Sequence, residues 1–185
     1  MEIKLSILIC TLKSRFEYFN ELMLLLIPQK TSEIEILSEI DSGEMTIGEK
    51  RTKLMNLSKG EYIAFIDDDD EVSKDYVSKI LKAIESKPDC TSLTGVITHD
   101  GINPELFCHS IKYKQWQTNT NNEPIKYERN PNHLNAIKRD IAIKYSFIPV
   151  NHGEDQDWSM RIQNELKTET EIEGCIYHYK YRSNK

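Results

Sequence analysis

Apolar residues in the first hundred positions follow two patterns in alternation. Short apolar runs bounded by turn-forming residues are typical of buried β-strands, and they occupy residues 5–10, 34–40, 62–66 and 93–98. Between these runs, apolar residues recur at the three- and four-residue spacing of a helix. The alternation predicts the α/β fold class, with a parallel sheet, right-handed crossovers and helices on both faces.

Local signals predict where the intervening helices begin and end. Ser14 with Glu17, and Thr46 with Glu49, match the capping box, in which two side chains bond the free backbone N–H groups of a first helical turn. The second of these helices is expected to reach about residue 58, and a third, over residues 77–84, to stop before Pro88.

The second half of the chain is less regular. Strands are expected at residues 106–114 and 125–129, around a polar surface loop at 117–123. Helices are expected at 135–145 and 155–166, and a last strand at 172–181. No repeat, linker or domain boundary is visible, so we expect residues 1–185 to form a single domain.

Four consecutive aspartates, Asp67 to Asp70, directly follow the apolar residues 63–66. Carboxylates held this close resist joint ionisation, and a hard divalent cation with oxygen ligands relieves that repulsion. The alternative is an acidic turn that starts a helix, with Ser73 as its N-cap and the acids at the positive end of the helix dipole. Four acids exceed what that alternative needs, so the pattern favours a metal site.

Other polar residues follow neighbouring predicted strands. Thr11 and Lys13 come after the first strand and Asp41 after the second. Ligands of open parallel sheets bind beyond the carboxyl ends of the strands. The residues therefore predict one crevice of the nucleotide-binding type.

Composition limits the classes of partner. The chain has 185 residues and a net charge of −6, without a long basic run, so a nucleic acid is not expected as a ligand. None of the four cysteines forms a C-x-x-C pair, which indicates free thiols in a reducing compartment. No signal peptide and no transmembrane segment is recognised, and we expect a cytoplasmic location.

Several motifs, taken in order, resemble family-2 glycosyltransferases of the GT-A fold. They are residues 5–11, the turn at Asp41, residues 48–51, the stretch Lys59 to Asp70, and Gly153-Glu154-Asp155 with Arg161. The resemblance implies a Rossmann-like, mostly parallel central sheet with a small antiparallel extension on the acceptor side. Residues 1–100 would then bind a nucleotide sugar and residues 101–185 an acceptor.

The same resemblance implies roles for the residues on the nucleotide side. Thr11, Leu12, Lys13 and Arg15 would contact the nucleotide, Asp41 the base, and Lys50 with Arg51 the base or the diphosphate. Asp67 would meet the ribose, next to Asp68, and Asp69 would bind Mn²⁺ or Mg²⁺. Without the resemblance, Lys50 and Arg51 would equally suit a solvated helix face.

Three further positions are candidates on the acceptor side. Asp155 matches the general base of the family, and Glu154 is expected to orient an acceptor or to hold Arg161. Acids in a first helical turn also suit the helix dipole, and Asp157 with Arg161 is an ordinary i,i+4 pair. Trp116 borders the polar loop and could stack on an acceptor sugar.

His178, in the last predicted strand, has two interpretations. Related enzymes often use a late histidine as an additional metal ligand, and imidazole tolerates Mn²⁺. A lone histidine in a strand is as often structural. The sequence leaves the choice open.

Together these features predict an inverting, metal-dependent transfer of a sugar from a nucleotide diphosphate donor, with a UDP-sugar expected, to a hydroxyl group of a glycan or other acceptor. The metal would stabilise the diphosphate leaving group, and Asp155 would take the acceptor proton. One alternative is a sugar-phosphate nucleotidyltransferase, although residues 11–15 lack its glycine-rich loop. Another is a binding module that holds a nucleotide sugar without turnover.

Overall fold

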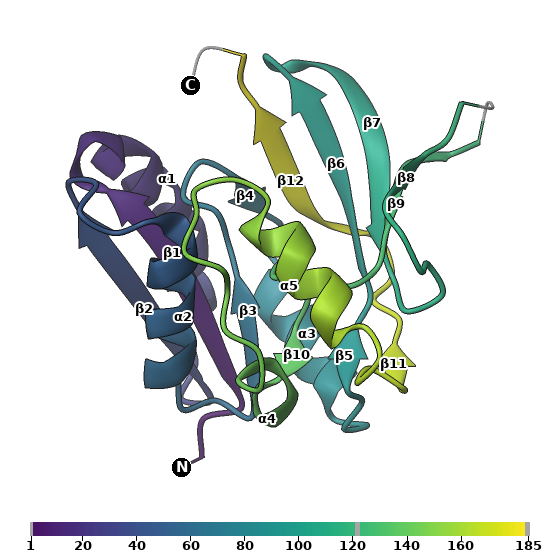
Figure 1. The fold of residues 1–185 in the computed structure, drawn as a ribbon, viewed down its shortest axis with the longest axis horizontal. Coiled ribbons are helices and arrows are strands. Elements are labelled where there is room, and N and C mark those ends of the chain that lie inside the picture. The colour runs from purple at the N-terminus through teal and green to yellow at the C-terminus, as the bar shows by residue number, and fades with distance from the viewer. Residues whose placement is uncertain (1, 121–122, 184–185) are drawn as a thin grey trace.

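The chain folds into two six-stranded sheets with helices packed on the first (Figure 1). The computed structural model describes residues 2–120 and 123–183. The first sheet has the order β11 (Glu169–Thr170), β5 (Cys90–Thr91), β10 (Ile137–Lys138), β3 (Tyr62–Phe65), β1 (Leu5–Leu12), β2 (Ile34–Asp41). The second has the order β4 (Glu71–Val72), β12 (Cys175–Tyr181), β6 (Leu93–His99), β7 (Ile102–His109), β9 (Ile125–Arg129), β8 (Gln117–Thr118).

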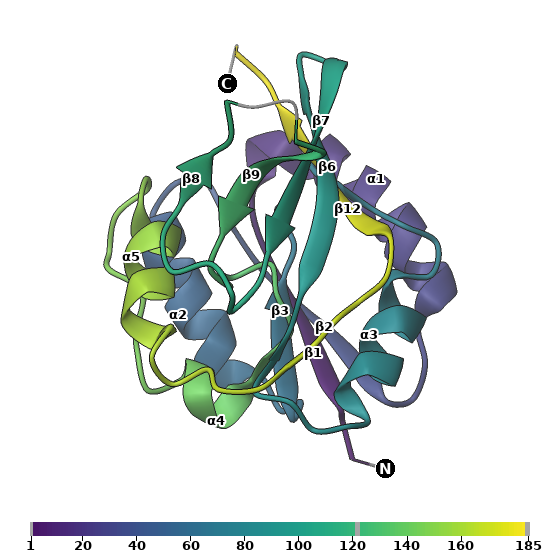
Figure 2. The ribbon, with the colours of Figure 1, turned by 90° about the vertical axis from the view of Figure 1, so that its right-hand side faces the viewer.

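Helices cover both faces of the first sheet, as Figure 2 shows: α1 and α3 lie on one side and α2, α4 and α5 on the other. Their bounds are α1 (Phe16–Leu26), α2 (Ile47–Leu57), α3 (Tyr76–Ile84), α4 (Arg139–Ala142) and α5 (Glu154–Ile162), with 3₁₀ turns η1 (Lys13–Arg15) and η2 (Ile27–Gln29) flanking α1. Every residue of β1 and β3 except Leu12 is buried, because helices cover both faces of these two strands.

The predicted α/β class and the parallel arrangement of the first three strands are confirmed. β1 pairs in parallel with both β2 and β3. The capping box at Thr46 is also confirmed, since Thr46 and Glu49 bond each other's backbone N–H groups at the start of α2.

The strand predicted at residues 93–98 does form, but it lies in the second sheet. β6 turns at Asp100 and Gly101, both with positive φ, and pairs antiparallel with β7 and parallel with β12. The place beside β3 is taken by the short antiparallel β10. A strand pattern in the sequence shows only that a segment is extended; its neighbours depend on the turn that follows.

Two local predictions are wrong, the cap at Ser14 and the helix at 135–145, and so is the N-cap at Ser73 on which the alternative to a metal site depended. Ser14 caps no helix, because a 3₁₀ turn precedes α1 and its N-cap, Arg15, makes no side-chain cap bond. Ser73 bonds Asp75, and α3 begins at Tyr76. Residues 135–145 form β10 and the single turn α4 rather than one helix.

Candidate active site

The aspartates after β3 and the residues after β1 lie together at the carboxyl edge of the first sheet. Thr11 Oγ1 donates to Asp68 Oδ2 at 2.5 Å. Arg15, from η1, pairs with Asp68 at 2.6 Å and Asp69 at 2.8 Å. The predicted convergence of strand ends thus brings these side chains within hydrogen-bond distance.

Each of the four aspartates has hydrogen-bond or ion-pair partners, which offset part of their mutual repulsion. Arg182, just beyond β12, donates to Asp69 Oδ2 at 2.9 Å. Asp70 accepts from the Tyr177 hydroxyl and the Lys180 N–H, at 2.8 Å each, and lines neither of the two cavities described below. Burial raises the pKa of Asp70 well above its ordinary value, and the neighbouring Asp67 adds to that shift.

Arg51 joins two acids from distant parts of the chain. It is 3% exposed, and its Nη1 lies 2.5 Å from Glu154 while its Nη2 lies 2.8 Å from Asp67. Burial alone would raise the pKa of Asp67, but the charges and hydrogen bonds of Arg51 and His133 together outweigh it and hold that pKa well below the usual range. Glu154 therefore holds Arg51 and not Arg161, which pairs with Asp157 at 2.5 Å.

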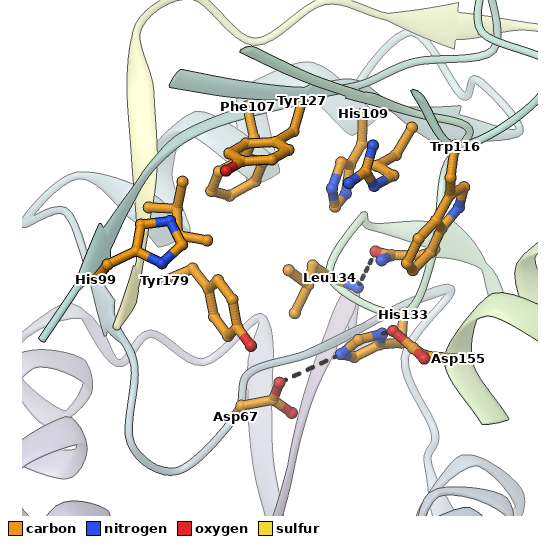
Figure 3. Close-up of a pocket in the computed structure, with 13 residues that line it drawn as sticks. Asp67, His99, Phe107, His109, Trp116, Tyr127, His133, Leu134, Asp155 and Tyr179 are labelled. Carbon is orange, nitrogen blue, oxygen red and sulfur yellow. Dashed lines mark hydrogen bonds and ion pairs between the residues drawn. The ribbon is translucent and has the colours of Figure 1, made fainter. Parts of the chain in front are cut away.

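His133 lies between Asp67 and Asp155 (Figure 3). Its Nε2 is 3.0 Å from Arg51 Nη2 and 3.6 Å from Asp67 Oδ2, and its Nδ1 is 3.7 Å from Asp155 Oδ2. A guanidinium only donates hydrogen bonds, so Nε2 accepts and Nδ1 carries the ring proton. Nδ1 is buried and has no hydrogen-bond partner among the described residues, so its proton is available to Asp155.

Asp41 and Lys50 build the wall beside this cluster. Asp41 accepts the N–H groups of Gly43 and Met45 at 3.1 and 2.8 Å and forms an ion pair with Lys50. Lys50 Nζ also donates to the Thr11 carbonyl at 2.8 Å. Asp41 thereby fixes the turn after β2, and it lines neither of the two cavities described next.

Two cavities meet at this cluster. A polar cavity of about 490 Å³ is lined by eight of the predicted donor-side residues and by the first two acids of α5: Thr11, Leu12, Arg15, Lys50, Arg51, Asp67, Asp68 and Asp69, with Glu154 and Asp155. An aromatic cavity of about 280 Å³ lies against the second sheet and includes Phe107, Trp116 and Tyr127. Asp67, His133, Asp155 and Tyr179 line both.

Three predicted residues line neither cavity: Asp41, described above, and also Lys13 and His178. Lys13 is exposed and lines neither. His178 bonds Thr98 Oγ1 at 2.9 Å and lies 3.4 Å from Glu71. Successive side chains of a strand point to opposite faces, so His178 points away from the face on which Tyr179 lines both cavities, and the structure does not bring it together with Asp69.

Sequence analysis missed Tyr179 and Arg182 and gave His133 no part in the cluster. All three come from the second half of the chain, where the motifs are weakest. The sequence offered one signal for Arg182. It directly follows the last predicted strand, just as the aspartates directly follow the strand at residues 62–66.

The residues fit a divalent cation that is coordinated partly by aspartate oxygens and partly by oxygens of a bound diphosphate. Carboxylate oxygens suit Mg²⁺ and Mn²⁺, and Asp67, Asp68 and Asp69 all line the polar cavity. Among residues 2–120 and 123–183, no three His, Cys, Asp or Glu side chains form a metal-binding group. Mg²⁺ commonly takes only one or two carboxylates and completes its shell with phosphate oxygens and water.

The sequence of the chain is similar to those of known glycosyltransferases. A family model described as "Glycosyl transferase family 2" matches residues 42–147, more than half of the chain. The glucosyl-dolichyl phosphate glucuronosyltransferase of Haloferax volcanii is 23% identical over 186 positions, which cover 83% of this chain and 58% of that protein.

Solved structures share the fold. Residues 1–349 of S. aureus TarS in complex with UDP-GlcNAc superpose with a TM-score of 0.71 at 15% identity, covering 99% of this chain and 60% of that one. The complex of the same protein with UDP gives 0.68 at 15% identity, covering 96% and 60%. The predicted GT-A fold is confirmed. The chain spans about 60% of these relatives, and no helix in its described part is both long and apolar enough to cross a membrane.

Proposed function

The chain belongs to glycosyl transferase family 2, and from that membership we propose that it moves a sugar from a UDP-sugar to an acceptor hydroxyl group with inversion at the anomeric carbon. The observation that carries the proposal is the shared wall of the two cavities. Asp155 lines both the polar cavity and the aromatic cavity. A carboxylate at that junction can reach an acceptor on one side and a reacting sugar on the other.

The polar cavity is the proposed donor site. Arg15 and Lys50 line it and supply fixed positive charge, and an arginine fork suits phosphate oxygens. Asp69, with Asp67 or Asp68, would hold Mn²⁺ or Mg²⁺, which neutralises charge that develops on the leaving diphosphate. The TarS structures contain UDP-GlcNAc and UDP, which supports uridine as the donor nucleotide here.

Asp155 is the proposed general base. It lies in the first turn of α5, next to the free backbone N–H groups of the helix N-terminus. The His133 Nδ1 proton faces Asp155 Oδ2 and would orient it. Once the acceptor hydroxyl loses its proton to Asp155, its oxygen attacks the anomeric carbon as the bond to the diphosphate breaks. A single displacement inverts the configuration.

Arg51 is a positioning residue in this scheme. Its two Nη atoms are occupied by Glu154, Asp67 and His133, and its ring neighbours Phe65 and Phe147 lie 5.9 and 5.8 Å from the guanidinium carbon. It therefore fixes Asp67 and the start of α5 relative to each other.

The test is turnover of UDP-sugars by the purified chain with Mn²⁺, followed by UDP release and by the anomeric configuration of the product. Asp155→Asn should keep the fold and UDP binding but lower turnover about 100- to 10,000-fold, the usual contribution of a general base. Asp157→Asn, two residues further along α5 and lining neither cavity, is the control. Turnover by Asp155→Asn at the wild-type rate, or a product with retained configuration, would refute the proposal.

A further inference from the structure

The aromatic cavity contains one cation that the proposed reaction does not use. Arg129 ends β9 and lines the cavity with Tyr127, two residues earlier on the same face of the strand. Its guanidinium carbon lies 5.0 Å from the ring centre of Trp116 and 5.4 Å from that of Tyr127. Two aromatic rings thus hold this charge in the cavity wall.

The charge of Arg129 has no acidic partner among residues 2–120 and 123–183. Its Nη1 donates to the main-chain carbonyls of Gln117 and Glu128, and no carboxylate lies within ion-pair distance. By contrast, Arg15, Arg51 and Arg182 each pair with at least one aspartate. Burial lowers the pKa of Arg129, as expected of a partly desolvated cation without a compensating acid.

A second group in the same wall also lacks a partner. The indole Nε1 of Trp116 is buried and has no hydrogen-bond acceptor among the described residues. A buried N–H normally finds one. An uncompensated cation and an unsatisfied donor, side by side, suit a ligand with negatively charged oxygens.

We propose that this cavity binds an acceptor sugar that carries a negative charge, either a carboxylate or a phosphate, with the anion against Arg129. The inference rests on the proposed function. The opposite wall of the cavity is formed by Asp67, His133 and Asp155 (Figure 3). The two acids there repel an anion, so the charged group lies at the sheet and the reacting hydroxyl is directed toward Asp155. The aromatic side chains between the walls pack against the sugar ring.

The test is a ligand-observed NMR titration of the whole chain, with UDP present, using three probes: methyl β-D-glucuronide, D-glucose 6-phosphate and methyl β-D-glucoside. We expect the anionic probes to bind about tenfold more tightly than the neutral one, which corresponds to one charge-assisted hydrogen bond. Arg129→Gln should abolish the difference. Lys126→Gln is the matched control, because Lys126 also lies on β9 but lines neither cavity, and it pairs with Glu105. It should keep the difference.

A preference for only one of the anionic probes would support the proposal and identify the charged group. Equal or undetectable binding of all three probes, or a preference that survives in Arg129→Gln, would overturn it. UDP affinity, measured in the same samples, separates the two proposals: normal UDP binding without an anion preference removes only the inference about the acceptor.

Discussion

Nδ1 of His133 lies 3.7 Å from Oδ2 of Asp155, on the edge of the ring that faces away from Arg51. Because Arg51 occupies Nε2, the imidazole presents its proton to the carboxylate. The distance exceeds that of a hydrogen bond, and catalytic hydrogen bonds often tighten only when substrate is bound. His133 thus connects the aspartates after β3 with the proposed base on α5.

We expect His133→Phe, which keeps a planar ring without nitrogen atoms, to lower kcat about 10- to 100-fold, the value of one charge-assisted hydrogen bond. The KM for the donor should change less than kcat, because the cations Arg15 and Lys50 of the donor cavity remain. Steady-state kinetics over donor and acceptor concentrations separates the two parameters.

His178→Gln is the matched control for that experiment, since His178 lines neither cavity. Wild-type Mn²⁺ dependence in this variant would show that His178 is not a metal ligand. A kcat of His133→Phe equal to that of the wild type would remove His133 from the scheme.

Arg51→Met should destabilise the protein by about 3–5 kcal/mol, because it leaves two buried or partly buried acids without their cation. Arg161→Met removes a partly exposed i,i+4 pair with Asp157 and should cost at most about 1 kcal/mol. Urea unfolding of both variants measures the difference. Equal losses would show that Arg51 does not hold the cluster together.

The sequence was most informative where local pattern decides structure. The runs at β1 and β3 are apolar on both faces, so their burial between two helical layers could be predicted. Because the carboxyl ends of parallel strands lie at one edge of a sheet, Thr11 could be placed near the aspartates. The 2.5 Å hydrogen bond from Thr11 to Asp68 confirms this. These conclusions need only the order of strands and helices.

The sequence was least informative where the structure depends on pairing between segments that are far apart in the chain. Nothing within residues 93–99 shows that β6 belongs to the second sheet, because that depends on the turn at Asp100 and Gly101. His133 lies in a loop without a periodic pattern, and its position depends on a backbone bond from Phe65 N–H to its carbonyl at 2.8 Å. Arg182 reaches Asp69 only because β12 pairs with β4.

Acid should destabilise the protein through His109. Burial lowers the pKa of His109 to about 3 from an ordinary 6.5, so the folded state binds fewer protons than the unfolded state between these values. Stability therefore falls as the pH drops below about 6.5, by up to about 1.4 kcal/mol per pH unit from this group.

His109→Asn should flatten the pH dependence of the unfolding free energy between pH 6.5 and 4. His99→Asn is the control, because the His99 side chain is 38% exposed. An unchanged slope in His109→Asn would show that His109 is not the group responsible.

Arg182→Gln should raise the KM for the donor about tenfold, with a smaller effect on kcat. In the structure Arg182 pairs with Asp69 at 2.9 Å. We expect it to exchange that carboxylate for a phosphate oxygen of the donor. Initial rates at varied UDP-sugar concentration measure the change, and Arg161→Gln, on the exposed side of α5, controls for loss of a charge. A donor KM equal to that of the wild type would exclude Arg182 from the donor site.

The central claim, that the polar cavity holds a nucleotide diphosphate and a cation through the aspartates after β3, is tested most directly by a crystal structure of the chain with UDP and Mn²⁺, using anomalous diffraction from manganese. We predict a manganese peak beside Asp69 that bridges to the diphosphate in the polar cavity. UDP bound elsewhere, or UDP in the cavity with Asp69 still paired to Arg15 and Arg182 and no manganese beside it, would contradict the account.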